Sequence, residues 1–138
     1  MQECRLSAQL TAAAPYRCVY SAARAGSDGC GLWVQGKIVG AKGITVVAQK
    51  PSFLAVALRA PGFALNALVL HAPVDGSEAA SAWWGEALAA ARSLGVAAPT
   101  AVFVVANARI GSETSASIGP LNADAQSSNG WWFHDFLA

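Results

Sequence analysis

Three polar side chains stand where apolar stretches of the sequence end: Glu3, His71 and Asn107. A carboxylate at the end of a strand can bind a hard cation such as Mg²⁺. A histidine can give or take a proton near neutral pH, and an amide can bind a phosphate oxygen without adding charge. Together, these groups are suited to metal-assisted hydrolysis of a phosphoester.

Each of these side chains also has a purely structural interpretation. Glu3, taken alone, is a solvated carboxylate near the terminus. His71 can simply bond a backbone group at a strand end, and Asn107 can bond its own turn. We expect His134, which lies in an aromatic segment, to be structural. The functional hypothesis therefore depends on the combination of the three groups and on their order.

The strands that must position these groups follow from hydrophobic periodicity. Apolar runs separated by Gly, Pro and Ser predict strands at residues 16–21, 30–34, 44–48, 53–59, 63–71 and 100–105. The first two flank a Gly/Ser/Asp turn and should form a hairpin. The next three lie close together, which favours antiparallel pairing. The Ala-rich segment 6–15 is uncommitted and is compatible with a short helix.

The period of the pattern changes at residues 77–94, where apolar residues recur at helical spacing. Asp75 or Ser77 can cap the first turn of this helix. Residues 106–129 are predicted to form a long polar loop, and residues 130–137 open a second helix. The sequence therefore predicts an α/β fold of layered α+β type, with a mixed, mostly antiparallel sheet and flanking helices.

Two pairs of tryptophans lie in the predicted helices, Trp83-Trp84 and Trp131-Trp132. They favour packing in the core over stacking on nucleic-acid bases. Arg109, as a lone arginine in a loop, is little indication of a phosphate site.

Length and composition are typical of a single globular domain. The chain has 138 residues, of which 54% are hydrophobic and 12% are charged, and its formal net charge is +1. This charge gives no strong basic field that would attract nucleic acid by itself. No apolar run approaches the roughly 20 residues that cross a membrane. The composition therefore predicts a protein without membrane association.

The cysteines and the N-terminus indicate an intracellular protein, nuclear or cytoplasmic. Cys4, Cys18 and Cys30 are odd in number and lack metal-type spacing, which favours reduced thiols over one disulfide and a free thiol. The segment 1–5 carries a charge pair before any apolar region, so it is not a secretory signal.

The sequence resembles the endonuclease/exonuclease/phosphatase superfamily, which has the deoxyribonuclease-I-like fold. Five segments match family patterns in the family's order, most closely those of endonuclease domains related to non-LTR retrotransposons. They are Gln2-Glu3-Cys4-Arg5-Leu6, Gly29-Cys30-Gly31-Leu32-Trp33-Val34, Leu70-His71-Ala72-Pro73, Ala106-Asn107-Ala108-Arg109-Ile110-Gly111, and a last pattern with Ile118-Gly119-Pro120, Asn129-Gly130 and Phe133-His134-Asp135-Phe136-Leu137.

This resemblance implies a partial deoxyribonuclease-I-like sandwich and a Mg²⁺-dependent hydrolysis of phosphodiesters, with nucleic acid as the substrate class. By the same resemblance, Glu3 would bind Mg²⁺, His71 would protonate the leaving oxygen, and Asn107 would bind the scissile phosphate. No cofactor besides Mg²⁺ is implied.

The sequence departs from the family pattern at the residues that the chemistry most needs. Val105 stands where the family's G-D-F-N segment has its aspartate, and valine can neither take a proton nor bind a cation. The family's first strand and its closing S-D-H segment are not found. We therefore expect residues 1–138 to be a domain incomplete at both ends. Loss of such groups costs several powers of ten in rate, so activity should be weak or absent.

Three alternatives stay open. The chain could be an active hydrolase that recruits Asp75, Glu113 or Asp124, or a group from a partner chain. It could be a non-catalytic interaction module that self-associates through an uncovered sheet face. It could also be a fragment produced by an incorrect gene model.

Overall fold

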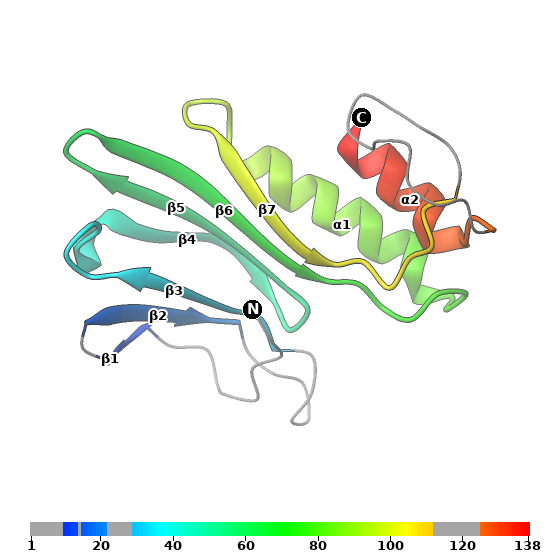
Figure 1. Ribbon diagram of the computed structural model, residues 1–138, viewed down its shortest axis with the longest axis horizontal. Coiled ribbons are helices and arrows are strands. Elements are labelled where there is room, and N and C mark those ends of the chain that lie inside the picture. The colour runs from blue at the N-terminus through cyan, green and yellow to red at the C-terminus, as the bar shows by residue number, and fades with distance from the viewer. Residues whose placement is uncertain (1–9, 14, 22–28, 112–124) are drawn as a thin grey trace. The chain divides into compact units, whose positions relative to one another are not determined.

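A computed structural model describes residues 10–13, 15–21, 29–111 and 125–138 (Figure 1). The chain divides into two compact units, each of which draws on separate stretches of sequence. The first unit comprises Met1–His71 and Ala89–Val104, and the second comprises Ala72–Leu88 and Val105–Ala138. Among the described residues, no helix is long and apolar enough to cross a membrane.

The first unit begins with a sheet of three antiparallel strands. These are β1 (Leu10–Ala13), β2 (Tyr16–Tyr20) and β3 (Gly31–Gln35), in that spatial order. The predicted hairpin of the second and third strands is confirmed. The helical interpretation of the Ala-rich segment is wrong for β1, where Leu10 pairs with Val19. Pairing with a neighbouring strand overrides the helix propensity of a short alanine run.

A second sheet contains four strands, β4 (Ile44–Lys50), β5 (Phe53–Ala60), β6 (Phe63–His71) and β7 (Thr100–Val105). A short 3₁₀ helix, η1 (Ala41–Gly43), precedes β4. The first three strands of this sheet are antiparallel neighbours, as the short turns between them predict. All four strands were predicted from periodicity to within a few residues.

Strand β7 returns to the sheet beside β6 after helix α1 (Ala79–Ser93). The N–H of Asn66 bonds the carbonyl of Pro99 at 2.8 Å, and the N–H of Ala72 bonds that of Val105 at 2.8 Å. From the first bond to the second, the residue number rises in both strands, so β7 runs parallel to β6. The segment is therefore a β–α–β connection, and the sheet is mixed.

The core of the first unit lies between its two sheets. Cross-strand pairs such as Leu54 with Val69 and Val56 with Ala67 place alternate residues of β5 and β6 on one face. These residues form one buried cluster with apolar residues from the other sheet and its flanks: Val19, Cys30, Leu32, Val34 and Val39. Burial of one of the larger side chains, such as valine or leucine, contributes about 1.5–3 kcal/mol. This cluster therefore supplies much of the unit's stability.

Two buried polar side chains join elements of the first unit. Ser21 donates from Oγ to the carbonyl of Pro51 at 2.9 Å and accepts the N–H of Cys30 at 2.7 Å. Asn66 donates from Nδ2 to the carbonyls of Leu94 and Ala98, at 3.3 and 3.2 Å. Asn66 therefore ties β6 to the segment that follows α1.

The cysteines that the structure describes are consistent with the predicted reduced state. Cys18 and Cys30 are buried, and neither is in a disulfide. Cys4 lies outside the described residues.

The second unit contains the first turns of α1 and the helix α2 (Ser128–Leu137). Aromatic contacts join the two helices, because the ring of Trp84 lies 5.8 Å from that of Phe133 and 5.7 Å from that of Phe136. The predicted second helix is confirmed and begins two residues earlier than expected. Trp84 is 3% exposed, as its predicted role in packing requires.

Candidate functional site

The structure describes two of the three residues predicted to form a site. His71 ends β6 in the first unit, and Asn107 lies in the second unit, two residues after β7 ends. Glu3 lies outside the described residues, so its place in a site stays a prediction.

His71 occupies the strand end that the sequence predicts. Its backbone N–H bonds the carbonyl of Ser52 at 2.9 Å, which closes the turn between β4 and β5 against the end of β6. The residue is half-buried. A histidine fixed in this way at a strand end has a defined backbone position from which its imidazole can act.

Asn107 makes a specific contact through its side chain. Its Nδ2 donates to the carbonyl of Ala72 at 2.6 Å, across 35 positions of sequence. Its φ of 47° lies in the left-handed region, which asparagine tolerates better than most residues. The alternative that Asn107 bonds its own turn is thus replaced by a longer-range contact. One amide hydrogen is used to hold the loop after β7 against the segment after β6.

Val105 is the residue at the position of the expected aspartate. It ends β7, its side chain is 49% exposed, and its carbonyl accepts the N–H of Ala72. An isopropyl group presents no lone pair to a proton or a cation. The end of β7 therefore carries an apolar surface where the family pattern has a carboxylate.

The loop after β7 is held by the N-terminus of α2. Ser127 is the N-cap, and its Oγ accepts the N–H of Gly130 at 3.2 Å and that of Arg109 at 3.0 Å. The N–H of Ser127 in turn bonds the carbonyl of Arg109 at 3.0 Å. Gly130 lies so close to the Arg109 carbonyl that a Cβ atom would collide with it. Glycine is therefore required here to let the loop approach the helix.

Asn129 is the residue of this region whose structural role the sequence does not reveal. It is fully buried, its Oδ1 accepts the indole N–H of Trp84 at 3.2 Å, and its Nδ2 donates to the carbonyls of Pro73, Ala106 and Asn107 at 2.8, 3.3 and 3.2 Å. These partners are 22 to 56 positions away. The only signal in the sequence was the Asn-Gly pair within the last family-like pattern.

Asp75 also serves the start of α2 and not the start of α1, for which it was a predicted cap. Its Oδ1 accepts the backbone N–H of Asn129 at 2.7 Å. A carboxylate beside the first turn of a helix is favoured by the helix dipole. This contact engages one of the three carboxylates that an active hydrolase could recruit. The other two candidates for recruitment, Glu113 and Asp124, lie outside the described residues.

His134 has the structural role predicted for it. A ring nitrogen, Nε2, lies 3.0 Å from the carbonyl of Ile110 and is positioned to donate to it. This contact adds a further link between α2 and the loop after β7.

Of the residues predicted to hold the implied Mg²⁺ and its substrate, the structure describes only those without a carboxylate, His71 and Asn107. Across the described ranges, no three side chains of His, Cys, Asp or Glu come together. Mg²⁺ requires oxygen ligands, usually with at least one or two carboxylates. Of the predicted set, only Glu3 carries a carboxylate, so a magnesium site would depend on a residue outside the described part.

No protein-family model matches this chain, and comparisons with curated proteins and with solved structures likewise find no match.

Proposed function

We propose that this chain is a divergent domain of the endonuclease/exonuclease/phosphatase type, with a partial deoxyribonuclease-I-like sandwich. Its ancestral reaction is Mg²⁺-dependent hydrolysis of phosphodiesters in nucleic acid, and this chain turns over slowly or not at all. The order of the five family-like segments supports the assignment. So does the β–α–β connection, in which His71 ends the first strand and Asn107 follows the last.

Any remaining chemistry would use the same three side chains. Glu3 would hold Mg²⁺, His71 would protonate the leaving oxygen, and Asn107 would bind the scissile phosphate through its amide. Of the two described residues, His71 is held by a backbone hydrogen bond to Ser52 and Asn107 by a side-chain hydrogen bond to Ala72. Positioning of this kind is necessary for general acid catalysis, but it does not replace a missing base.

The low turnover is inferred from a single observation, the valine at position 105. Its exposed isopropyl group stands at the end of β7, where a carboxylate would be needed to orient or deprotonate the attacking water. A positioned general base typically contributes about 10²–10⁴-fold to rate. We therefore expect the chain to cleave DNA no faster than its own His71→Ala variant.

Restoring the carboxylate tests this proposal. The Val105→Asp variant, incubated with Mg²⁺ or Mn²⁺ and supercoiled plasmid DNA, should cleave at least about tenfold faster than the natural sequence. Val105→Asn has the same shape but cannot accept a proton, and it should show no gain. Rapid metal-dependent cleavage by the natural sequence, abolished by His71→Ala, would contradict the proposed low turnover. A Val105→Asp variant that gained neither cleavage nor metal affinity would argue against a latent site.

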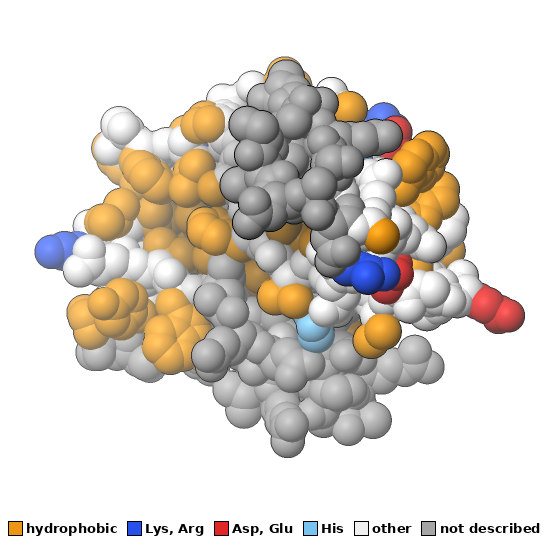
Figure 2. Space-filling model, turned by 45° about the vertical axis from the view of Figure 1, so that its right-hand side comes forward, with side chains coloured by type: hydrophobic (Ala, Val, Ile, Leu, Met, Phe, Trp, Pro, Cys, Tyr) orange, Lys and Arg blue, Asp and Glu red, His pale blue; other side chains and the backbone are white. Residues whose placement is uncertain are grey.

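A second candidate function is favoured by the surface of β7. Val102, Phe103 and Val105 are 37%, 42% and 49% exposed, and Figure 2 shows broad hydrophobic areas with few charged side chains between them. Exposed apolar strands of this kind are interaction surfaces. In this alternative the chain is a non-catalytic module that binds a second copy of itself through β7.

A further inference from the structure

The net charge of +1 conceals an uneven distribution of charge between the two units. The sequence of the first unit contains eight lysine and arginine residues and two acidic residues, so its formal charge is +6. That of the second unit contains one arginine and six acidic residues, a formal charge of −5. Within the described part of the first unit, every lysine, arginine, aspartate or glutamate is basic: Arg17, Lys37, Lys42, Lys50, Arg59 and Arg92. The first unit by itself therefore attracts anionic partners, although the whole chain is nearly neutral.

The connection between β3 and β4, residues 36–43, joins the two sheets at one end of the first unit (Figure 1). It carries two exposed lysines, Lys37 and Lys42. The connection is held in place, because the N–H of Ile38 bonds the carbonyl of the last residue of β3 at 2.9 Å and Val39 is fully buried in the core cluster. Ile38 itself is 49% exposed. An aliphatic side chain is therefore held in water between two lysines.

Two arginines flank this connection. A Cβ built on Gly36 would lie 3.7 Å from Nε of Arg17, and this Nε is buried with no hydrogen-bond partner among the described residues. A Cβ built on Gly43 would collide with the carbonyl of Arg59, so the end of the connection lies against β5. The guanidinium of Arg59 bonds the carbonyl of Leu65 at 3.0 Å and other neutral groups, so no described carboxylate neutralises it. Four cations thus gather around one exposed isoleucine.

Exposed aromatic residues border the same connection. Tyr16 is 41% exposed and Trp33 is 63% exposed, their ring centroids are 6.5 Å apart, and Tyr16 pairs with Gln35 where β3 ends. Phe63 is 36% exposed and begins β6 after the turn from β5, at the same end as the connection (Figure 1). Tryptophan and tyrosine side chains favour the boundary between an apolar phase and water. This end of the first unit therefore combines basic and apolar side chains.

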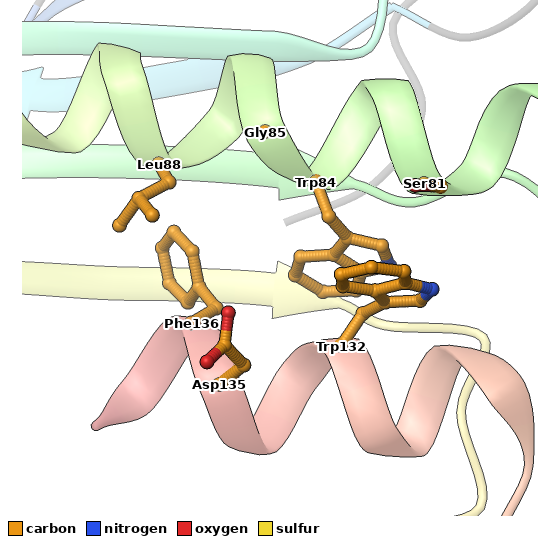
Figure 3. A pocket seen from close by; sticks show the side chains of 7 residues that line it. All are labelled: Ser81, Trp84, Gly85, Leu88, Trp132, Asp135 and Phe136. Atoms are coloured by element: carbon orange, nitrogen blue, oxygen red, sulfur yellow. The ribbon is translucent and has the colours of Figure 1, made fainter.

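The cleft between the two helices of the second unit offers no site of this kind (Figure 3). Trp84 lines it but is 3% exposed, and its ring lies 5.7 Å from that of Phe136, so packing of the two rings leaves no room for a ligand between them. The charged side chain that lines the cleft is an aspartate, Asp135. An anionic partner would be repelled there.

An anionic bilayer fits the surface of the first unit better than nucleic acid does. Apolar side chains on exposed turns are stabilised when they enter the boundary of the acyl chains, whereas an isoleucine offers no ring on which a base can stack. Each lysine or arginine near an anionic bilayer strengthens binding about fivefold. Binding of this kind requires no membrane-spanning segment, whose absence was the reason to expect a protein without membrane association.

We propose that this end of the first unit binds the surface of a bilayer that contains anionic phospholipid. Ile38 and Phe63 enter the boundary of the acyl chains, and Trp33 lies at the level of the headgroups. Lys37 and Lys42 bind the phosphate and carboxylate groups of the lipids. The proposal is independent of the proposed phosphodiesterase function, because it uses none of the three side chains predicted for that reaction.

Binding is measured on the full chain by co-sedimentation with large unilamellar vesicles. Vesicles of phosphatidylcholine with about 30% phosphatidylserine should bind the chain at about 0.1 M NaCl. Vesicles of pure phosphatidylcholine should bind it at least about tenfold more weakly, and about 0.5 M NaCl should weaken binding to the anionic vesicles. Equal binding to the two kinds of vesicle, or no binding to either, would overturn the proposal.

Two lysines provide a matched test of charge. Lys42 lies just before β4 and Lys50 ends it, and both are exposed. Lys42→Glu should weaken binding to the anionic vesicles by about tenfold or more, because attraction becomes repulsion. Lys50→Glu changes the net charge by the same amount and should weaken binding by no more than about twofold. Equal weakening by the two variants would contradict the assigned surface.

A second pair of variants tests the apolar contact. Ile38→Ser should weaken binding to the anionic vesicles by about fivefold. Val46→Ser removes a side chain of similar exposure, 41%, within β4 and should leave binding unchanged. Circular dichroism checks that both variants are folded. Vesicle binding that Ile38→Ser leaves unaltered would contradict the proposal.

Fluorescence anisotropy of a labelled oligothymidine tests nucleic acid as the occupant of the same surface. We expect the oligonucleotide to bind more weakly than the anionic vesicles do and to be insensitive to Ile38→Ser. Tighter binding of the oligonucleotide, weakened by Ile38→Ser, would assign the surface to nucleic acid and overturn the proposal.

Discussion

The side chain of Asn129 bonds Trp84 of one helix and the backbone of two loops, at Pro73 and Ala106. A buried asparagine can donate two hydrogen bonds and accept two, so this residue is close to fully satisfied. Its chemistry is the same as that of Asn107, yet its burial makes it far more important for stability. Two asparagines of the second unit thus differ in the number of hydrogen-bond partners that each side chain satisfies.

Truncating Asn129 should therefore destabilise the protein strongly. We expect Asn129→Ala to lower the free energy of unfolding by about 3 kcal/mol, because the indole N–H of Trp84 and buried carbonyls lose their partner at about 1–3 kcal/mol each. Urea denaturation monitored by tryptophan fluorescence measures this change.

The control for this variant is Asn107→Gly. It removes the bond to Ala72, but glycine adopts the φ of 47° more easily than asparagine does, so the change should stay below about 1 kcal/mol. Equal destabilisation by the two variants would show that Asn129 has no special role in holding the second unit.

At the scale of elements, helix α1 is built from ordinary helix formers with one exception, Gly85. Its position is exposed and open, so a methyl group fits without moving any neighbour. Gly85→Ala should stabilise the protein by up to about 1 kcal/mol through helix propensity. Differential scanning fluorimetry should show a rise in melting temperature of roughly 4 °C.

Gly95 provides the opposite case just beyond the end of the same helix. Its φ is +67°, in the left-handed region where alanine is strained. Gly95→Ala should lower the melting temperature, although no heavy atom lies within 4 Å of the added Cβ. If both substitutions changed stability in the same direction, backbone conformation would not be the cause.

The elements were also the part of the structure that the sequence predicted best. The continuous apolar run in Phe53–Ala60 and the helical spacing in Ala79–Ser93 reflect local burial, which leaves a pattern in the residues themselves. The strand Leu10–Ala13 was not predicted, since its alanines carry no such pattern and its conformation follows from pairing with β2. Helix α2 was found from its aromatic residues, but its N-cap Ser127 was not.

The candidate site was harder to predict than the elements. The strand end at His71 could be read from the apolar run before it. The bonds of Asn66 to Leu94, of Asn129 to Pro73 and of Ser127 to Arg109 could not, because they join segments that are 18 to 56 positions apart. Such contacts depend on how the strands and helices are connected, and a single sequence contains no direct record of that.

At the scale of the whole molecule, the edges of the four-stranded sheet differ. Among the strands that the structure describes, β4 forms one edge and β7 the other. The edge strand β4 ends in Lys50 and contains a register shift between Val46 and Ala48, and both features discourage pairing with another chain. Strand β7 reads Thr-Ala-Val-Phe-Val-Val, with no charge. It is the edge with the least protection against pairing.

We expect β7 to pair with β7 of a second copy in an antiparallel arrangement around a two-fold axis, since identical edges are self-complementary. Sedimentation velocity at increasing protein concentration should show a reversible monomer–dimer equilibrium. In a symmetric dimer, the Phe103→Lys substitution places two lysines, one from each copy, close to the shared interface. This variant should weaken dimerisation by about tenfold or more.

Val47→Lys is the matched control for this last prediction. Val47 is 39% exposed on β4 and Phe103 is 42% exposed on β7, so the two substitutions change surface hydrophobicity and net charge alike. Only the β7 variant should shift the dimer equilibrium if that edge is the interface. Equal shifts would indicate non-specific hydrophobic association, and a natural sequence that stays monomeric at all concentrations would rule out the self-associating module. In a protein that stays monomeric, β7 would bind no partner, and Val105 at its end would still lack the carboxylate that a hydrolase needs.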